Sequence, residues 1–358
     1  MSHSEPKWDH LFRLTDDCGL IQHARGSVPL YQSGYTLDDN ARALLVVLEG
    51  YRQQQKPEYL ELVRRYLAFI LWTQQPDGRF VNFVGYDRRF LEPYGSQESQ
   101  GRALLALAEV STQSIDEGVS AAAEQAIERS LPQAKFSALR AAAYGLVAAL
   151  TLLKSDKKGE QVQLAEALRQ HCRQLLLGAF QRTAETNWAW FEPTLTWGNG
   201  LLPWALWKEA AFSGDPQVVR VASQSLDFLN RVCTTPQGYT ALVGNRGWYA
   251  RGADKAIYDE QPIDAADLLF ANVAAFQVTE ADRYLVAAKK AYAWFHGENR
   301  LGCALFDPAS GGCRDGLGES EINLNEGAES LLAYLGSTLM VRQLPFREQW
   351  SEVVPVAV

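Results

Sequence analysis

The sequence has no run of about 18 apolar residues, which is the length that a membrane-spanning helix needs. Residues 1–10 are polar and contain no apolar segment of the kind that a secretory signal requires. The five cysteines are odd in number and form no CxxC pair, which favours reduced thiols in the cytoplasm over a disulfide framework. The net charge is −8 and the basic residues are scattered. We therefore expect a soluble cytoplasmic protein whose partners include neither a membrane nor nucleic acid.

The motifs that bind nucleotides or catalytic metals are also missing. The sequence contains no Walker loop, no GxGxxG and no HExxH, and its histidines and cysteines form no zinc-binding cluster. Asp16-Asp17 together with Asp38-Asp39 could ligate calcium, but clustered carboxylates also serve sugar-binding sites. We therefore predict neither a metal nor a cofactor.

What the sequence does contain is an alternation of two kinds of helix. Helices that are apolar on all sides alternate with helices that carry one apolar stripe, and these patterns are typical of buried and surface positions respectively. The apolar helices are predicted to start near Asp38, Gln97, Ser137, Gly200, Pro262 and Asn325. The amphipathic helices are predicted at 58–74, 121–130, 161–180, 216–232 and 281–295, and residues 345–358 could add a short last helix. Most successive apolar helices start about 60 residues apart, which indicates a repeat of helical hairpins.

Six buried helices, each with an outer partner, predict an all-α fold of the (α/α)6 toroid type. We expect a single domain over residues 1–358, with an irregular entry segment over 1–34 and short β-like segments in the long loops. An α-solenoid would give a similar alternation. Solenoids, however, have short and uniform linkers, whereas every other linker in this chain is long.

The long linkers all run from an outer helix into the next inner helix, so in a toroid they would line one cavity. Polar residues recur at these helix starts. The carboxylates predicted to be catalytic are Asp38, Asp39, Glu98, Asp264 and Glu326. The residues predicted to bind the substrate are Tyr35, Arg42, Arg102, Trp190, Trp197, Trp248, Tyr258, Gln261 and Asn325.

This set of side chains suits a sugar. Indole rings stack on the apolar face of a pyranose, while carboxylates, carboxamides and guanidinium groups bind its hydroxyls. Cleaving a glycosidic bond needs an acid and a base or nucleophile, and both are usually Asp or Glu. Our preferred pair is Asp264 with Asp38 or Asp39 across the cavity.

Each candidate also has a purely structural interpretation. Asp38 and Asp39 could be a helix cap and a local salt bridge, because helix N-termini favour anions. Glu98 and Arg102 are four residues apart and could simply pair on one helix face. The remaining candidates have equally local alternatives: Trp190 could be loop packing, and Asp264 and Glu326 could be first-turn anions. Recurrence at five helix starts favours the functional interpretation.

Several motifs resemble a known group of proteins. They are Arg13-Leu14-Thr15-Asp16-Asp17, Gly19-Leu20-Ile21-Gln22-His23, the segment from Gly34 to Ala43, the segment from Gly95 to Arg102, and the segment from Asn323 to Ser330. Together they resemble the six-hairpin glycosidase-like domains, and more narrowly the bacterial domains found beside or fused to retaining glycosyltransferases that use nucleotide sugars. The resemblance spans nearly the whole chain and implies an (α/α)6 fold. It also implies a possible glycosyltransferase partner, although this chain lacks the nucleotide-sugar domain.

Two other toroid families allow a comparison of reactions. Unsaturated glucuronyl hydrolases use an Asp as acid and base, which Asp38 or Asp39 could mimic. N-acylglucosamine 2-epimerases use a pair of histidines, and only His23 and His296 lie near the candidate loops of this chain. The sequence therefore predicts a carbohydrate-active protein, first of all a glycoside hydrolase that acts on oligosaccharides or glycans. The alternatives are a non-catalytic glycan-binding partner of a glycosyltransferase and a sugar epimerase or isomerase.

Overall fold

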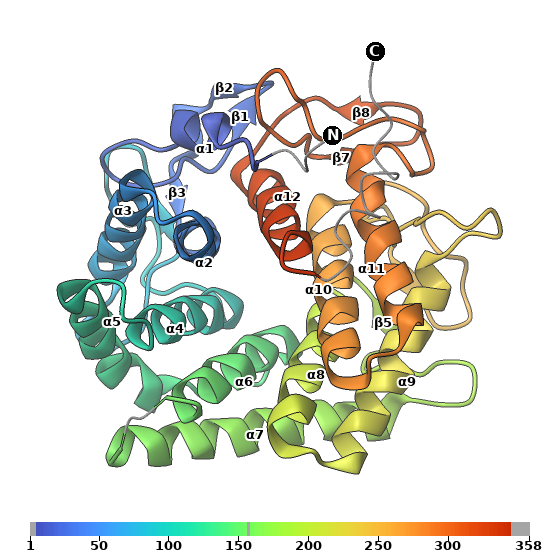
Figure 1. Cartoon of the computed structure of the whole chain (residues 1–358), viewed down its shortest axis with the longest axis horizontal. Coiled ribbons are helices and arrows are strands. Elements are labelled where there is room, and N and C mark those ends of the chain that lie inside the picture. Colours follow the sequence, from blue (N-terminus) through green and yellow to red (C-terminus); the bar gives the residue numbers. More distant parts are fainter. Residues whose placement is uncertain (1–4, 156–157, 345–358) are drawn as a thin grey trace. The chain divides into compact units, whose positions relative to one another are not determined.

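The computed structural model describes residues 5–155 and 158–344, and most of this chain is helical (Figure 1). The described residues divide into two compact units. The N-terminal unit contains residues 14–23 and 29–178, and the C-terminal unit contains residues 5–13, 24–28 and 179–344. The prediction of a single domain stays a prediction, and each unit is described by itself.

The N-terminal unit consists of helical hairpins. Its helices are α2 Leu37–Gln54, α3 Pro57–Thr73, α4 Gln97–Ser111, α5 Glu117–Ser130, α6 Leu139–Leu153 and α7 Glu160–Thr183, whose last residues continue into the other unit. The even-numbered helices α2, α4 and α6 are the buried ones, and α4 packs against both α2 and α6. Helix α3 starts with Pro57 in its first turn, where proline's fixed φ suits a helix. Helix α4 starts at the Ser96 cap, whose side chain accepts a hydrogen bond from the backbone of Ser99.

The C-terminal unit continues the same alternation. Its helices are α8 Leu201–Ser213, α9 Pro216–Cys233, α10 Pro262–Thr279, α11 Asp282–Ala293 and α12 Ala328–Val341. Helix α10 is its centre and packs against α8, α11 and α12. Gly200 is the last residue before α8, and a Cβ atom there would lie 2.3 Å from the backbone of Asp267 in α10. A glycine at this position therefore lets the start of α8 approach α10 closely.

The strands are short and lie in the linkers. They are β1 Ala24–Arg25, β2 Val28–Pro29, β3 Tyr35–Thr36, β4 Phe83–Val84, β5 Thr194–Leu195, β6 Tyr249–Ala250, β7 Gly316–Leu317 and β8 Ile322–Asn323. They pair as four two-stranded sheets; in the antiparallel pair of β3 with β4, for example, Tyr35 lies opposite Val84. The expected short β segments in the long loops are thus confirmed.

The predicted helix starts agree with the structure to within a few residues. The largest differences are at α12, which starts at Ala328 rather than near Asn325, and at α5, which starts at Glu117 rather than 121. The entry segment is less irregular than predicted, because it contains the helix α1 Asp9–Leu14 and the 3-10 turn η1 Tyr31–Ser33. The proposed short helix within 345–358 lies outside the described residues. Among the described helices, none combines the length and the apolar character needed to cross a membrane.

Candidate functional site

In the N-terminal unit, a cluster of charged side chains lies where α2 and α4 begin. Asp38, in the first turn of α2, forms an ion pair with Nη1 of Arg102 from α4 and a second with Nη2 of Arg42 at 3.2 Å. Arg102 is only 2% exposed, and its Nη2 donates a hydrogen bond of 2.5 Å to the hydroxyl of Tyr144 from α6. The carboxylate of Asp38 compensates the charge of this buried guanidinium, as a buried charge requires. Three buried helices therefore meet at one polar cluster, which we call the Asp38 cluster (Asp38, Arg42, Arg102 and Tyr144).

Asp39 has a different environment, although it is the next residue. Its backbone N–H donates to Oγ1 of Thr36 at 3.0 Å, and the Thr36 hydroxyl donates to Oδ2 of Asp39 at 2.7 Å. Its Oδ1 also lies 3.6 Å from Nη1 of Arg42. The residue is 5% exposed. This is a helix cap with a local salt bridge, so the structure gives Asp39 a role in starting α2, which the sequence allowed as its structural interpretation.

Of the three predicted catalytic carboxylates in this unit, Glu98 is the one that has no bonding partner in the described residues. It lies in the first turn of α4, is half-buried, and makes no hydrogen bond or ion pair with any residue in 5–155 or 158–344. The pairing of Glu98 with Arg102 that the spacing allowed does not form, because Arg102 binds Asp38 instead. Residues four apart on a helix lie on the same face, so Glu98 is one turn away from the ion pair of Asp38 with Arg102.

Tyr35 is placed differently from its predicted role in binding substrate. It is 1% exposed and its hydroxyl donates to Oδ2 of Asp16 at 2.6 Å. Burial, together with this bond and the charge of Asp16, raises the pKa of Tyr35. These contacts indicate that Tyr35 fixes the entry segment to the rest of the N-terminal unit.

In the C-terminal unit, the start of α10 carries two acids. Asp264 is 5% exposed and its Oδ1 accepts a long hydrogen bond of 3.4 Å from the backbone of Asn199. Glu260, two residues before α10, is completely buried. Its Oε2 accepts hydrogen bonds from Nε1 of Trp294 at 2.8 Å and from the backbone of Leu242 at 2.9 Å. Burial raises the pKa of Glu260. Its contacts make Glu260 an anchor for the long linker into α10.

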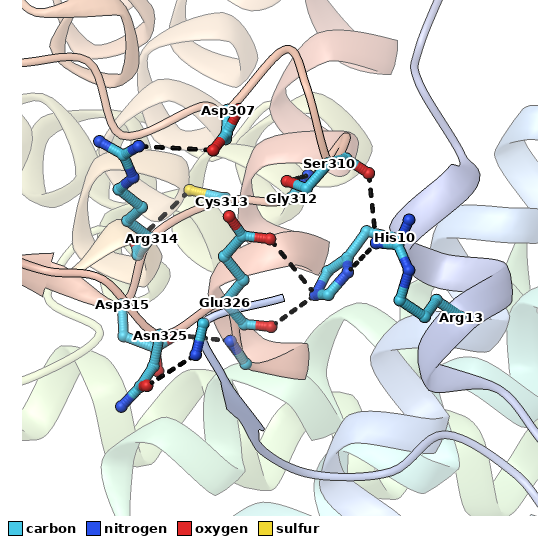
Figure 2. A network of polar contacts seen from close by, with 12 residues as sticks. His10, Arg13, Asp307, Ser310, Gly312, Cys313, Arg314, Asp315, Asn325 and Glu326 are labelled. Atoms are coloured by element: carbon cyan, nitrogen blue, oxygen red, sulfur yellow. Dashed lines mark hydrogen bonds and ion pairs between the residues drawn. The ribbon is translucent and has the colours of Figure 1, made fainter. Parts of the chain in front are cut away.

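Glu326, just before α12, lies in a second buried network (Figure 2). Nη1 of Arg13 donates to Nδ1 of His10 at 2.8 Å, so Nε2 of His10 must carry the imidazole hydrogen. Nε2 donates to the backbone carbonyl of Glu326 at 2.7 Å and lies 3.8 Å from its Oε2. His10 is completely buried, and that burial lowers its pKa, so the imidazole is neutral in this network.

The carboxylate of Glu326 is held against the backbone of the preceding loop. A Cβ atom at Gly312 would lie 2.1 Å from its Oε2, so a larger residue there would displace the carboxylate. The backbone N–H of Glu326 donates to the carbonyl of Gly26 at 3.1 Å, and the N–H of Gly26 donates to Oδ1 of Asn325 at 3.1 Å. The neighbouring predicted ligand Asn325 therefore already binds backbone (Figure 2).

The predicted aromatic platforms fall into two groups. Trp190 is 0% exposed and packs against Phe191 and Phe228, which is the position of a core residue and leaves no face for a sugar. Trp197 and Trp248, by contrast, are half-buried, as are Tyr258 and Gln261.

The sequence did not single out His10, and it placed Glu260 only among the polar residues that precede α10, not among the catalytic candidates. His10 follows a polar N-terminus and its partner lies 316 residues later in the chain, so no local pattern could reveal the pair. Glu260 directly precedes the Gln261-Pro262 helix start, and that position was the available signal. Within 5–155 and 158–344, no group of three or more His, Cys, Asp or Glu side chains could hold a metal ion.

The candidate carboxylates are divided between the units. Asp38, Asp39 and Glu98 belong to the N-terminal unit, and Asp264 and Glu326 belong to the C-terminal unit. The structure brings Asp38 and Arg102 together, whereas a cavity shared by all five acids stays a prediction.

No protein-family model matches the chain, and no curated protein matches it. Solved structures do. A D-mannose isomerase matches with a TM-score of 0.69 and 12% identity over 94% of this chain and 96% of that chain. A cellobiose 2-epimerase from Bacillus thermoamylovorans matches with a TM-score of 0.69 and 12% identity, over 93% and 95%. An inactive variant of an α-1,6-mannanase from a Salegentibacter species, in complex with α-1,6-mannotetrose, matches with a TM-score of 0.60 and 12% identity, over 93% and 95%.

These matches cover nearly the full length of both chains in each case, so the similarity concerns the whole fold. At 12% identity they show the fold and not the reaction. The fold class is all-α, of the (α/α)6 toroid type of these neighbours, as the alternation of helices predicted.

Proposed function

We propose that this protein is a carbohydrate-active enzyme, and within that class a glycoside hydrolase. One observation carries the proposal: Glu98, a half-buried carboxylate without a partner in the described residues, lies on α4 one helical turn before Arg102, and the guanidinium groups of Arg102 and Arg42 hold the carboxylate of Asp38 in place. Hydrolysis of a glycosidic bond needs two carboxyl groups with different roles. The two carboxylates differ in their contacts: Asp38 is paired with two guanidinium groups, whereas Glu98 has no partner in the described residues.

In this mechanism Glu98 donates the proton to the leaving oxygen. Asp38 acts as the second carboxylate, because its two guanidinium neighbours compensate its charge. Asp264 and Glu326 stay proposed members of the site from the C-terminal unit. The proposed substrate contacts are Arg42, Trp197, Trp248, Tyr258, Gln261 and Asn325. We leave out Trp190, Tyr35 and Arg102, which are buried.

The structural neighbours support this class of substrate. The isomerase, the epimerase and the mannanase are all named for reactions of sugars, and the mannanase variant was solved with a tetrasaccharide. That variant is described as inactive after two consecutive aspartates were replaced by alanine. This chain also has two consecutive aspartates, of which Asp38 pairs with Arg102 and Asp39 binds Thr36, the residue that caps α2.

The test is a panel of neutral oligosaccharides, including α-1,6-mannotetrose, assayed for newly formed reducing ends. Glu98→Gln should reduce turnover by about 10²–10⁴-fold, the usual contribution of general acid catalysis. Its thermal unfolding should be unchanged, because Glu98 has no bond to lose. Glu117→Gln is the matched control, since Glu117 occupies the first turn of α5 and is exposed. Equal turnover of the Glu98 variant and the wild type would remove Glu98 from the mechanism.

A sugar epimerase or isomerase is the second candidate, and one observation favours it. The Nε2 atom of His296 is buried and has no hydrogen-bond partner in the described residues. Burial lowers the pKa of His296 to about 4. The imidazole is therefore neutral at pH 7, the form that an epimerase base needs, although its lowered pKa makes it a weak base. Product analysis in D2O separates the two reactions: epimerisation incorporates deuterium without forming new reducing ends. Saturable binding with no product at all would instead support the non-catalytic glycan-binding alternative.

The cellular setting belongs to the same proposal. All five cysteines are free thiols, which fits a reducing compartment, and we propose the cytoplasm. We also propose a glycosyltransferase as a possible partner, on the resemblance of the motifs described above. Co-purification of a glycosyltransferase with the tagged full-length chain tests this partner, and the absence of any such enzyme from the eluate would count against it.

A further inference from the structure

A groove opens on the exposed face of α3, and its lining residues include none from α2 or α4. The exposed residues of α3 that line it are Glu61, Arg64, Arg65, Ala68 and Trp72. They recur at three- and four-residue intervals and so form one stripe on the helix. Ala68 is much smaller than its neighbours, and the hollow lies over it. Asp17, Cys18 and Arg88 form the opposite wall. The volume is about 460 Å³, which lies within the range of ligand sites.

Trp72 is the aromatic wall of the groove, and its orientation is fixed. It is 41% exposed. Its ring makes an edge-to-face contact with the buried Phe69 at 5.8 Å and a tilted contact with Phe90 at 5.1 Å. An indole held in this way presents apolar surface without losing further rotational freedom when a ligand binds.

The polar groups of the groove are also held in place by the fold. Nη1 of Arg65 donates to the carbonyl of Asp16 at 2.9 Å, and no carboxylate of the described chain pairs with Arg65. Arg88 binds Asp17 at 2.6 Å across 71 residues of sequence, and its backbone has a φ of 64°, in the left-handed region that non-glycine residues rarely adopt. The groove therefore offers both hydrogen-bond donors and acceptors.

The charges of the groove indicate a neutral ligand. Arg64 pairs with Glu61 and with Asp116, and Arg88 pairs with Asp17, so most of the positive charge is compensated. The groups that remain for a ligand are the guanidinium of Arg65, the carboxylate oxygens of the groove and the indole of Trp72. Hydroxyl groups need donors and acceptors in equal measure, and a pyranose ring also has an apolar face that stacks on an aromatic ring.

We propose that this groove binds a neutral oligosaccharide, as a site additional to the one at the starts of α2 and α4. The ligand class rests on the proposed function, whereas the location rests on the groove itself. A chain anchored at Trp72 would raise the local concentration of substrate for the enzyme. The binding needs no chemical step, so it is independent of turnover.

The test uses full-length protein labelled with 5-fluorotryptophan and observed by fluorine NMR. Trp72→Phe assigns the Trp72 signal among the ten tryptophans and keeps an aromatic ring against Phe69. Titration with α-1,6-mannotetrose or cellotetraose should shift the Trp72 signal saturably. Arg65→Met should weaken this binding about tenfold or more, while Arg129→Met, which changes an exposed arginine of α5 outside the groove, should leave it unchanged.

The same titration of the Glu98→Gln variant separates this proposal from the proposed function. If turnover is lost but the Trp72 shift persists, both proposals stand. Movement of other tryptophan signals alone would overturn the groove and leave the enzyme proposal intact. If no signal moves with either sugar, the groove is overturned as an oligosaccharide site, and product analysis then decides the enzyme proposal separately. A Trp72 shift that does not saturate, or that Arg65→Met leaves unchanged, also overturns the groove.

Discussion

The imidazole of His296 should remain unprotonated until the solution is strongly acidic. It lies in a box of aromatic rings, with ring centres 4.9 Å from Tyr292, 5.7 Å from Tyr334 and 6.2 Å from Phe306. Its Nε2 has no hydrogen-bond partner in the described residues, and burial lowers its pKa from 6.5 to about 4. Both tyrosines stay neutral over this range, because burial raises their pKa values. Burial is the cause of the lowered pKa of His296, and no carboxylate charge contributes to offset the lost hydration.

The lowered pKa has a defined effect on stability. For a base whose pKa is lower in the folded state than in the unfolded state, the contribution to stability is complete at pH values above the unfolded-state pKa. That contribution is lost as the pH falls from 6.5 to about 4, because the unfolded chain binds the proton first. The full shift corresponds to about 3.5 kcal/mol, at about 1.4 kcal/mol per pKa unit.

The perturbation is His296→Phe, which keeps an aromatic ring in the box and removes the proton. The free energy of unfolding of the wild type, relative to this variant, should fall by about 3 kcal/mol between pH 7 and pH 4. His10 and the carboxylates are common to both proteins, so their contributions cancel in the difference. His23→Phe, at an exposed position, is the matched control and should show no such trend.

The pKa can also be measured directly. The Cε1 proton signal of His296, assigned with the variant, should not move between pH 7.5 and pH 5.5 in the folded protein. A midpoint near 6.5 would refute the reasoning, since it would show that water reaches the imidazole and that burial does not set its charge.

Two further substitutions test the buried networks of the C-terminal unit. Gly312→Ala should destabilise the fold by about 1–3 kcal/mol, because its Cβ atom would overlap the carboxylate of Glu326; Gly118→Ala, at an exposed and roomier position, is the control for thermal unfolding. Glu260→Ala should cost about 2–4 kcal/mol, because the indole N–H of Trp294 and the backbone N–H of Leu242 both lose their acceptor inside the protein. Glu260→Gln keeps an acceptor oxygen and should recover much of this loss. A urea-unfolding midpoint of the Gln variant equal to that of the Ala variant would argue against the assigned hydrogen bonds.

The helices were predictable because their signals are local. Apolar residues on all sides of α4 and one apolar stripe on α3 can be read within each segment, and so can the Thr36 and Ser96 caps. The short strands followed from the long linkers that contain them. The entry helix α1 was missed because it has only six residues, which is too short for a periodic pattern.

The site was less predictable because its bonds join distant segments. Spacing alone favoured a pair between Glu98 and Arg102, yet the structure pairs Arg102 with Asp38, which lies 64 positions earlier, and that choice depends on how α2 packs against α4. The Trp-rich loop before α8 was expected to expose its indoles, but Trp190 turns into the core. A tryptophan in a loop can therefore serve packing as well as recognition.

The consecutive acids Asp38 and Asp39 show how neighbouring residues on one helix take different roles. Adjacent side chains on an α-helix point about 100° apart, so one can turn back to the cap while the other faces a neighbouring helix. Asp39 binds Thr36 and starts α2, whereas Asp38 binds Arg102 of α4. Because Arg102 forms its ion pair with Asp38, Glu98 has no ion pair with Arg102. The same contact that fixes Asp38 between two cations therefore leaves Glu98 unpaired, and a pairing of Glu98 with Arg102 would require Arg102 to release Asp38.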